Sequence, residues 1–288
     1  MFHACIAGMT VSFESNDTAF FEKRLAEYSI PAPEKTDLLL RVTSSDLLEK
    51  PQGRELLRNG STSVLKLQDD RLALSTVGKI TGKVLQNTIF TPDYSVVDIE
   101  LYNGRRRSDL TVTDWEYVYT GATFANRLAY LGGVVMHGSS ISYEGKGIVF
   151  SAPSGTGKST HTALWQQRYG EKVTPVNDDK PAIRFVGEQP YIYGTPWSGK
   201  TDKNHNVSVP LHAVVFLERA PQNSIRRLSP TEAMLRINNE TVRPFYDAGQ
   251  GVRVLDCTQK LIETIPMYIL GCTISEDAVK LVKRELQW

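Results

Sequence analysis

Short runs of alternating apolar and polar positions, separated by turn residues, fill the first hundred residues. The runs with a period of two, or rich in β-branched residues, predict strands at 9–15, 37–44, 61–68, 71–77 and 94–102. The spacing over 20–28 predicts a helix, and so does the stretch 45–59, which Pro51 and Gly53 interrupt. We expect a β-rich N-terminal domain over residues 1–112, built as an antiparallel meander and used for substrate or partner recognition.

Longer periodic segments follow and predict a second domain over residues 113–288. Asp114 has the position of an N-cap before a helix at 115–133, and Ser275 the same position before a helix at 275–286. Between them the pattern predicts strands at 134–141, 145–153, 172–179 and 213–219, with a helix at 156–170. Strand, loop, helix and strand over 145–179 form a βαβ unit.

Composition narrows the class of partner. The chain has 33 Lys and Arg against 32 Asp and Glu, a net charge of +1, and 41% hydrophobic residues. This balance predicts no nucleic acid or membrane partner, because both attract a basic surface. The first residues lack a basic region before an apolar stretch, so no secretory signal is expected, and three cysteines without metal spacing suit a cytoplasmic protein.

The stretch SAPSGTGKST, residues 151–160, has the pattern of a phosphate-binding loop that opens a helix. Glycines allow backbone N–H groups to surround an anion, Lys158 reaches the β- and γ-phosphates, and the Ser159 hydroxyl binds Mg²⁺. Ala152 replaces the usual first glycine, which is acceptable where a small side chain suffices. The residues predicted to bind nucleotide are Ser154, Gly155, Thr156, Gly157, Lys158, Ser159 and Thr160.

Two acidic residues follow the next predicted strand. Asp178 lies twenty residues after Lys158, and Asp179 is adjacent. A right-handed crossover makes the strands before and after the helix parallel, so their carboxyl ends meet beside the phosphate site. One carboxylate would bind Mg²⁺ and the other would accept a proton from an incoming hydroxyl. A turn acid followed by an N-cap is the alternative interpretation of the pair.

His137, the first residue of HGSSI, lies before the loop, twenty-one residues ahead of Lys158. As a lone histidine beside a glycine it is either a structural turn residue or a group that binds phosphate or orients the base. The ordered set HGSSI, SAPSGTGKST and VNDD resembles the HPr kinase/phosphorylase group, whose fold is shared with ATP-dependent phosphoenolpyruvate carboxykinase. The resemblance covers about residues 125–218 and does not include the usual HPr kinase N-terminal domain.

This resemblance implies a mixed α+β or α/β P-loop kinase domain that transfers phosphate from ATP to a hydroxyl. It implies His137, Lys158 and Asp178 as catalytic residues, with Asp178 as the general base and Asp179, together with Ser159, as the metal partner. In the segment 194–206, GTPWSGKTDKNHN, we expect phosphate or acceptor contacts from Lys200, Lys203 and His205. The segment is either a lid over the site or a solvated loop.

The first functional hypothesis is therefore an ATP- and Mg²⁺-dependent kinase acting on free serine, on a serine of a peptide or protein, or on another small hydroxyl compound. Relatives in this group are often oligomeric, so a homo-oligomer is also expected. The alternative is a nucleotide-binding switch or assembly protein with little catalysis, whose N-terminal domain binds a partner. A decarboxylating carboxykinase ranks last, because the chain is short and lacks an obvious set of ligands for a carboxylate substrate.

Overall fold

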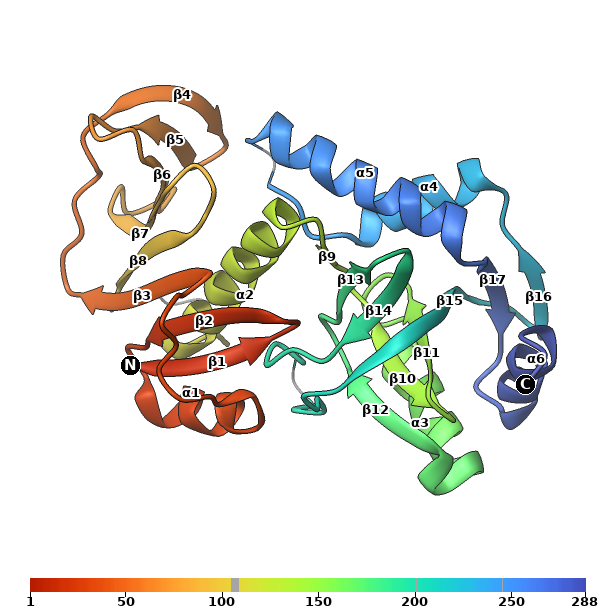
Figure 1. The fold of residues 1–288 in the computed structure, drawn as a ribbon. Helices are drawn as coiled ribbons and strands as arrows, with labels where there is room; N and C mark the ends of the chain where they lie inside the picture. Colours follow the sequence, from red (N-terminus) through yellow and green to blue (C-terminus); the bar gives the residue numbers. More distant parts are fainter. Residues whose placement is uncertain (105–108, 200, 245) are drawn as a thin grey trace. The chain divides into compact units, whose positions relative to one another are not determined.

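The computed structural model describes residues 1–104, 109–199, 201–244 and 246–288. Its contacts divide the chain into two compact units. Unit 1 comprises Met1–Tyr130 and Pro244–Ala248, and unit 2 comprises Leu131–Arg243 and Gly249–Trp288. Each unit is built on a large β-sheet with helices packed against it, so the protein is of the mixed α+β class (Figure 1).

Unit 1 contains an eight-stranded sheet in the order β1-β2-β3-β8-β7-β6-β5-β4. The strands are β1 (Phe2–Ile6), β2 (Met9–Glu14), β3 (Leu38–Ser45), β4 (Arg54–Asn59), β5 (Thr62–Lys66), β6 (Leu72–Val77), β7 (Val84–Phe90) and β8 (Val96–Tyr102). The helices of the unit are α1 (Thr18–Leu25), a 3₁₀ turn (Ala26–Tyr28) and α2 (Val112–Tyr130). The five predicted strands are confirmed, whereas β1 and β7 were not predicted.

The predicted meander is correct for β4 to β8, which pair antiparallel in sequence order. It is wrong for β2, β3 and β8, which pair in parallel. The helix α1 between β2 and β3 supplies the crossover that a parallel pair needs. The predicted helix at 45–59 is also wrong: its second half is β4, an exposed edge strand that completes its backbone hydrogen bonds with β5.

The helix α2 belongs to unit 1, so the division of contacts falls after residue 130 rather than at the predicted boundary of 112. The reason is packing, because α2 contacts β3 and β8 and buries Phe124 and Leu128. Asp114 is not the N-cap. Its carboxylate accepts from the Thr111 backbone N–H, while the Thr111 hydroxyl accepts from the Asp114 N–H, which is a capping box with Thr111 as the cap.

Unit 2 contains a nine-stranded sheet whose main path runs β12-β10-β11-β15-β14-β13-β9, with β17 beside β15 and β16 beside β17. The strands are β9 (Val134–Val135), β10 (Ser139–Tyr143), β11 (Lys146–Ser151), β12 (Val173–Asn177), β13 (Ala182–Val186), β14 (Gln189–Tyr193), β15 (Ser208–Arg219), β16 (Ser224–Arg227) and β17 (Met267–Cys272). The helices are α3 (Lys158–Tyr169), the 3₁₀ turn Gly170–Lys172, α4 (Pro230–Glu240), α5 (Ala248–Thr264) and α6 (Glu276–Glu285).

The predicted strand at 134–141 is divided in two. Val134–Val135 pairs with β13, whereas β10 pairs with β11 and β12, so the chain changes direction at His137 and Gly138. A Cβ atom on Gly138 would lie 2.7 Å from a methyl group of Val149, and this close approach requires glycine. The bend places His137 at the edge of the sheet rather than within a strand.

One face of the unit 2 sheet carries α3 and α6. Trp165 of α3 is fully buried and packs with Phe150 of β11, while Val279 and Val282 of α6 belong to the same apolar cluster. Ser275 caps α6 as predicted, since its hydroxyl accepts from the Ala278 N–H. This cluster fixes α3, and therefore the loop that precedes it, against the sheet.

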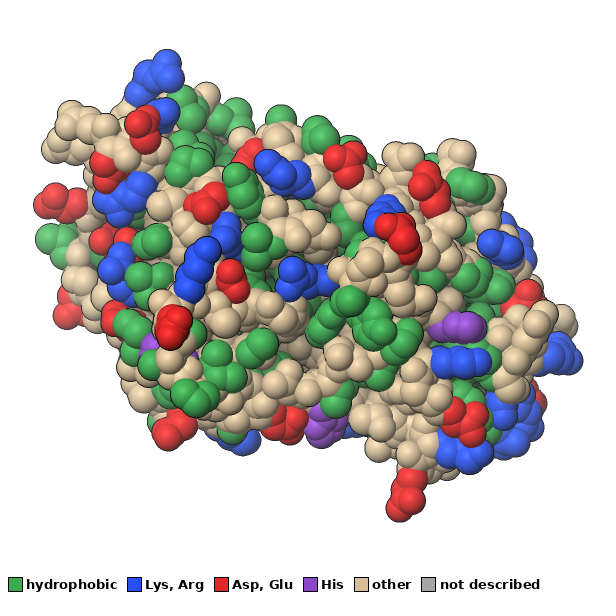
Figure 2. Space-filling view, viewed as in Figure 1, with side chains coloured by type: hydrophobic (Ala, Val, Ile, Leu, Met, Phe, Trp, Pro, Cys, Tyr) green, Lys and Arg blue, Asp and Glu red, His purple; other side chains and the backbone are tan. Residues whose placement is uncertain are grey.

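Basic and acidic side chains are interspersed on the face drawn in Figure 2, in keeping with the balanced charge of the sequence. Among the residues that the structure describes, no helix has the length and apolar character needed to span a membrane. The expected absence of a nucleic acid partner stays a prediction.

Candidate functional site

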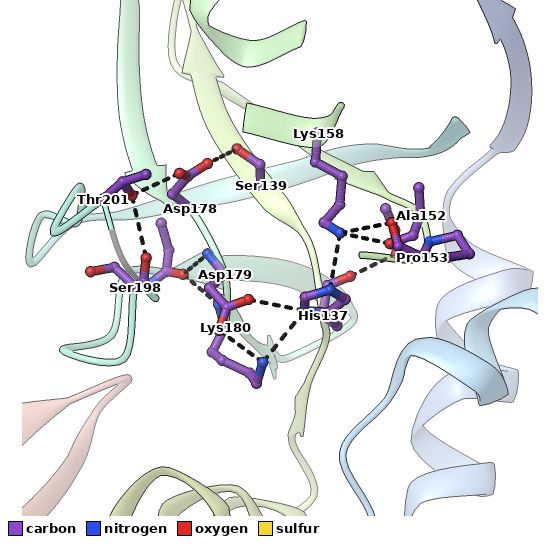
Figure 3. A network of polar contacts seen from close by, with 12 residues as sticks. His137, Ser139, Ala152, Pro153, Lys158, Asp178, Asp179, Lys180, Ser198 and Thr201 are labelled. Carbon is purple, nitrogen blue, oxygen red and sulfur yellow. Dashed lines mark hydrogen bonds and ion pairs between the residues drawn. The ribbon is translucent and has the colours of Figure 1, made fainter. Parts of the chain in front are cut away.

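Three segments of unit 2 meet at one edge of its sheet: the loop after β11, the turn after β12 and the bend before β10 (Figure 3). The strand β10 lies between β11 and β12 and runs antiparallel to both. The ends of β11 and β12 therefore lie beside the start of β10. The predicted parallel direction of β11 and β12 is confirmed, although β10 separates them, which the sequence pattern did not indicate.

A cavity of about 350 Å³ lies at this edge. It brings together most of the predicted site residues with three that were not predicted. The lining consists of His137, Ser154, Gly155, Gly157, Lys158, Ser159, Thr160, Asp178, Asp179, Ser198, Gly199 and Thr201. Thr156 does not line this cavity.

The loop between β11 and α3 depends on two glycines with positive φ, Gly155 at +77° and Gly157 at +117°. No atom lies within 4 Å of the Cβ position at either residue, so the backbone angle rather than space requires glycine. Gly157 is the N-cap of α3 and has no side chain to bind the first N–H groups of the helix. Ala152 has no positive φ and its side chain is buried in the core, which explains why alanine is tolerated there.

Lys158 is directed at the loop itself and at His137 (Figure 3). Its Nζ donates to the carbonyl oxygen of Ala152 at 2.7 Å and contacts Nε2 of His137 at 2.9 Å. Burial lowers the pKa of Lys158. Because an ammonium group only donates, Nε2 of His137 accepts this hydrogen bond, which leaves Nδ1 to donate to Asp179.

Asp179 is bound on both oxygens. His137 Nδ1 lies 3.0 Å from Oδ1, and Lys180 Nζ lies 2.8 Å from Oδ2. Burial acts to raise the pKa of Asp179, but the hydrogen bond from His137 and the charge and hydrogen bond of Lys180 outweigh it and hold the pKa below its ordinary value. Asp179 therefore stays ionised at neutral pH and is a poor proton acceptor.

Asp178 has different neighbours: among the described residues, both hydrogen-bond partners of its carboxylate are hydroxyl groups. Ser139 Oγ donates to Oδ1 at 2.6 Å, and Thr201 Oγ1 donates to Oδ2 at 2.7 Å (Figure 3). Ser139 is itself within 2.9 Å of Thr162 of α3. The adjacent carboxylates thus differ: Asp179 is bound by a lysine and a histidine, and Asp178 by hydroxyls.

The turn that presents both carboxylates is shaped by Asn177, a fully buried residue at the end of β12. Its Oδ1 accepts from the backbone N–H groups of Asp179 at 2.9 Å and Lys180 at 2.6 Å. Its Nδ2 donates to the carbonyl oxygen of Thr195 at 2.8 Å and to the Thr195 hydroxyl at 3.1 Å. Asn177 therefore joins the turn to the segment 194–206.

The segment 194–206 lies along the end of β12. The Asp178 N–H donates to the Lys203 carbonyl oxygen, and the His205 N–H donates to that of Val176.

Lys203 and His205 do not line the cavity of about 350 Å³, and a phosphate contact from either stays a prediction. Lys200 lies outside the described residues. Ser198, Gly199 and Thr201, which do line the cavity, were missed, because the approach of Gly199 to Asp179 and of Thr201 to Asp178 joins segments about twenty residues apart.

Oxygen ligands suitable for Mg²⁺ are present in the cavity: the Ser159 hydroxyl and the carboxylates of Asp178 and Asp179. Within the described part of the chain, no three His, Cys, Asp or Glu side chains are grouped to hold a metal ion by themselves. Mg²⁺ usually retains water and is bound by one or two carboxylates together with substrate phosphates, so this donor set fits a metal that arrives with a nucleotide.

Comparison with known proteins identifies a family. The family model described as SynChlorMet cassette protein ScmC matches residues 115–284, more than half of the chain. The chain belongs to the ScmC family. The matched region begins within α2 and includes the loop, the bend at His137 and both aspartates.

Other comparisons reach less far than the ScmC family match. The solved structure of the Hpr(Ser) kinase/phosphatase from Coxiella burnetii is similar with 12% identity and a TM-score of 0.33, over 52% of this chain and 95% of that chain. This is similarity at the level of the fold at most. No curated protein matches the chain.

Proposed function

We propose that this protein is a Mg²⁺-dependent phosphotransferase that moves the γ-phosphoryl group of ATP to a hydroxyl acceptor. One observation carries the proposal: the glycine loop, Lys158, Ser159 and the two aspartates surround a single cavity. The glycine loop, the lysine and the serine hydroxyl together bind phosphates and Mg²⁺ in many nucleotide-binding proteins. Asp178, whose carboxylate contacts hydroxyl groups among the described residues, adds a group that can accept a proton.

The loop would bind the phosphates through backbone N–H groups at the start of α3, where the helix dipole favours an anion. Lys158 would exchange its contacts with Ala152 and His137 for the β- and γ-phosphate oxygens. Before the nucleotide binds, those two contacts supply the partly buried ammonium group with hydrogen-bond partners in place of water, and they keep it beside the loop. Mg²⁺, held by Ser159 and Asp179 together with the phosphates, would neutralise charge that develops on the transferred group.

Asp178 would be the general base. The Thr201 hydroxyl, which donates to Oδ2 of Asp178 at 2.7 Å, occupies the kind of position that an acceptor hydroxyl needs. In the reaction the acceptor oxygen bonds to the γ-phosphorus as the bond from that phosphorus to the β–γ bridging oxygen breaks. The acceptor proton passes to Asp178, and ADP leaves.

Asp179 has the complementary role. Its lowered pKa keeps it charged, which suits a metal ligand, while the imidazole ring of His137 links it to Lys158. Before the nucleotide binds, His137 would thus hold the lysine and the metal carboxylate in one arrangement. We propose that the acceptor is a serine of a peptide or protein, or free serine.

The test is mass spectrometry of free serine, peptides and small proteins after incubation with the purified chain, ATP and Mg²⁺. We expect a phosphate mass shift on at least one hydroxyl compound, and its loss by about 10²-fold or more in Asp178→Asn, because a positioned base contributes at least that much. Asp256→Asn, an exposed carboxylate on α5, is the matched control and should transfer at the wild-type rate.

Titration calorimetry with ATP separates the possible failures. Asp178→Asn should bind ATP about as well as the wild type. Tight ATP binding with no transfer to any acceptor would contradict the kinase proposal and favour a nucleotide-dependent switch. Wild-type transfer by Asp178→Asn would remove Asp178 from the base role.

A further inference from the structure

A second cavity, of about 360 Å³, lies on the other side of the loop between β11 and α3. Gly155, Gly157 and Thr160 line both cavities, so the two meet at the loop. Thr156, which was predicted to bind nucleotide but does not line the first cavity, lines the second. Its volume falls in the range of about 300–1,000 Å³ that is typical of sites for small organic molecules.

The lining of the second cavity differs in chemistry from that of the first. Aliphatic side chains form its walls: Leu164 of α3, Leu217 near the end of β15, Ala220 and Ile274. Ile274 is 78% exposed, so its side chain is accessible to a ligand in this cavity. Among the residues that the structure describes, no aspartate or glutamate lines this cavity, whereas two aspartates line the first.

Polar residues of the second cavity are Thr156 of the loop, Thr160 and His161 of α3, Arg219 at the end of β15 and Thr273 after β17. Arg219 donates from Nη2 to the carbonyl oxygen of Gly155 at 2.6 Å, so its positive charge lies next to the loop. Thr273 lies at the rim, and its backbone N–H and hydroxyl bind Asn223, which holds the strand end in place. The cavity is therefore apolar with a cationic entrance, a combination that suits a flat organic group attached to a phosphate.

The order of groups along a bound nucleotide determines which end of it would face the second cavity. Lys158 and Ser159 act on the β- and γ-phosphates, and the base and metal carboxylates must lie near the γ-phosphate. The α-phosphate end then points away from Asp178 and toward the residues that the two cavities share. Whatever is attached to the α-phosphate enters the second cavity.

We propose that the second cavity binds the base and ribose of the donor, and that the donor is therefore a nucleoside triphosphate rather than pyrophosphate or an inorganic polyphosphate. This inference rests on the proposed function, because it assumes that the loop binds phosphates. Leu164, Leu217 and Ile274 would contact the faces of the base, and Arg219 would lie beside the α-phosphate and ribose. The first cavity is left for the γ-phosphate, the metal and the acceptor.

Cys272 provides a probe in the unmodified protein, because it lines the second cavity and is partly exposed. Burial raises the pKa of the Cys272 thiol, so its alkylation is best followed near pH 8.5. Cys5 of unit 1, also partly exposed, serves as the internal reference. Cys257 is buried with its pKa raised to about 11 and should react most slowly.

The experiment measures the alkylation rate of each cysteine by mass spectrometry, with Mg²⁺ alone, with Mg²⁺ and ATP, and with Mg²⁺ and tripolyphosphate. Both ligands are used at concentrations that calorimetry shows to be saturating. We expect ATP to slow the alkylation of Cys272 by about tenfold at 90% occupancy or more, with Cys5 unaffected and little effect from tripolyphosphate. Bound ATP that leaves Cys272 at its free rate, or equal protection by tripolyphosphate, would overturn the inference.

A pair of isoleucine variants tests the same inference independently. Ile274→Ala removes an exposed side chain, so folding is not at risk, and it should weaken ATP binding by about fivefold to tenfold while tripolyphosphate binds as before. Ile80→Ala, at a fully exposed isoleucine of unit 1, is the matched control. Unchanged ATP affinity in Ile274→Ala counts against the inference. Absence of ATP and tripolyphosphate binding in the wild type would instead contradict the proposed function itself.

Discussion

Replacing Asn177 with alanine tests the hydrogen bonding that positions both aspartates. The Asn177 side chain is fully buried and makes hydrogen bonds to the backbone of Asp179, Lys180 and Thr195 and to the Thr195 hydroxyl. Alanine can make none of these. The backbone groups that lose a partner lie at the turn after β12 and in the segment 194–206.

The expected loss of stability follows from the number of groups left without a partner. The carbonyl oxygen of Thr195 would lose a hydrogen bond in a buried place, and the N–H groups of Asp179 and Lys180 would each lose one in a partly buried turn. Each such group costs about 1–3 kcal/mol. Water entering the space left by the side chain reduces the total, so we expect the free energy of unfolding to fall by about 3 kcal/mol.

Urea unfolding followed by tryptophan fluorescence measures this change, since Trp165 is buried in unit 2. Asn223→Ala is the matched control, because Asn223 also bonds backbone and hydroxyl groups but is only half-buried, so water replaces its contacts. It should lose about 1 kcal/mol or less. A loss below about 1 kcal/mol in Asn177→Ala would refute the reasoning that this side chain holds the turn.

Three further predictions concern backbone angles and charge. Gly157→Ala and Gly145→Ala should each lower the free energy of unfolding by about 1–2 kcal/mol, because both glycines have positive φ and open space at Cβ. Only Gly157→Ala should also weaken ATP binding, as measured by calorimetry. Gly194→Ala should lower the thermal midpoint further than either, since its Cβ would clash with the carbonyl oxygen of His205. Burial raises the pKa of Glu116, so the native state keeps that proton to higher pH than the unfolded chain, and the free energy of unfolding falls as pH rises through this window. Urea unfolding at pH 5 and pH 8 should show a smaller fall in Glu116→Gln than in the wild type. An equal fall in the two proteins would contradict this explanation.

Strands with a clear period of two were predicted correctly from the sequence, but β7 was missed. Its central residues Gln86 and Asn87 are polar and nevertheless buried. The Asn87 amide donates to the carbonyl oxygen of Glu49 and to the Glu100 carboxylate, so its burial depends on partners in other segments. A pattern of apolar positions cannot show such a strand, because hydrogen bonds rather than hydrophobicity allow it to be buried.

The order of the strands was also beyond the pattern, and so was the parallel pairing of β2, β3 and β8 in unit 1. The sequences of β2 and β3, on either side of α1, do not show that the two strands pair in parallel. Only the pairing of β8 with β3 shows that β4 to β7 extend the same sheet. The same holds in unit 2, where β10 lies between the two strands of the βαβ unit. Strand order depends on the packing of whole elements, which no short window of sequence contains.

The sequence by itself determined the loop from Ser151 to Lys158 and the positions of Asp178 and Asp179 at the end of a strand. These features are local, since positive φ at Gly155 and Gly157 depends on the residue type and its immediate neighbours. Only the tertiary structure decided which partners each carboxylate has. Asp178 meets hydroxyls and Asp179 meets His137 and Lys180, because the bend before β10 and the segment 194–206 are brought to one sheet edge by long-range pairing. Hydrogen bonds across that distance depend on strand order, and strand order is a property of the folded chain.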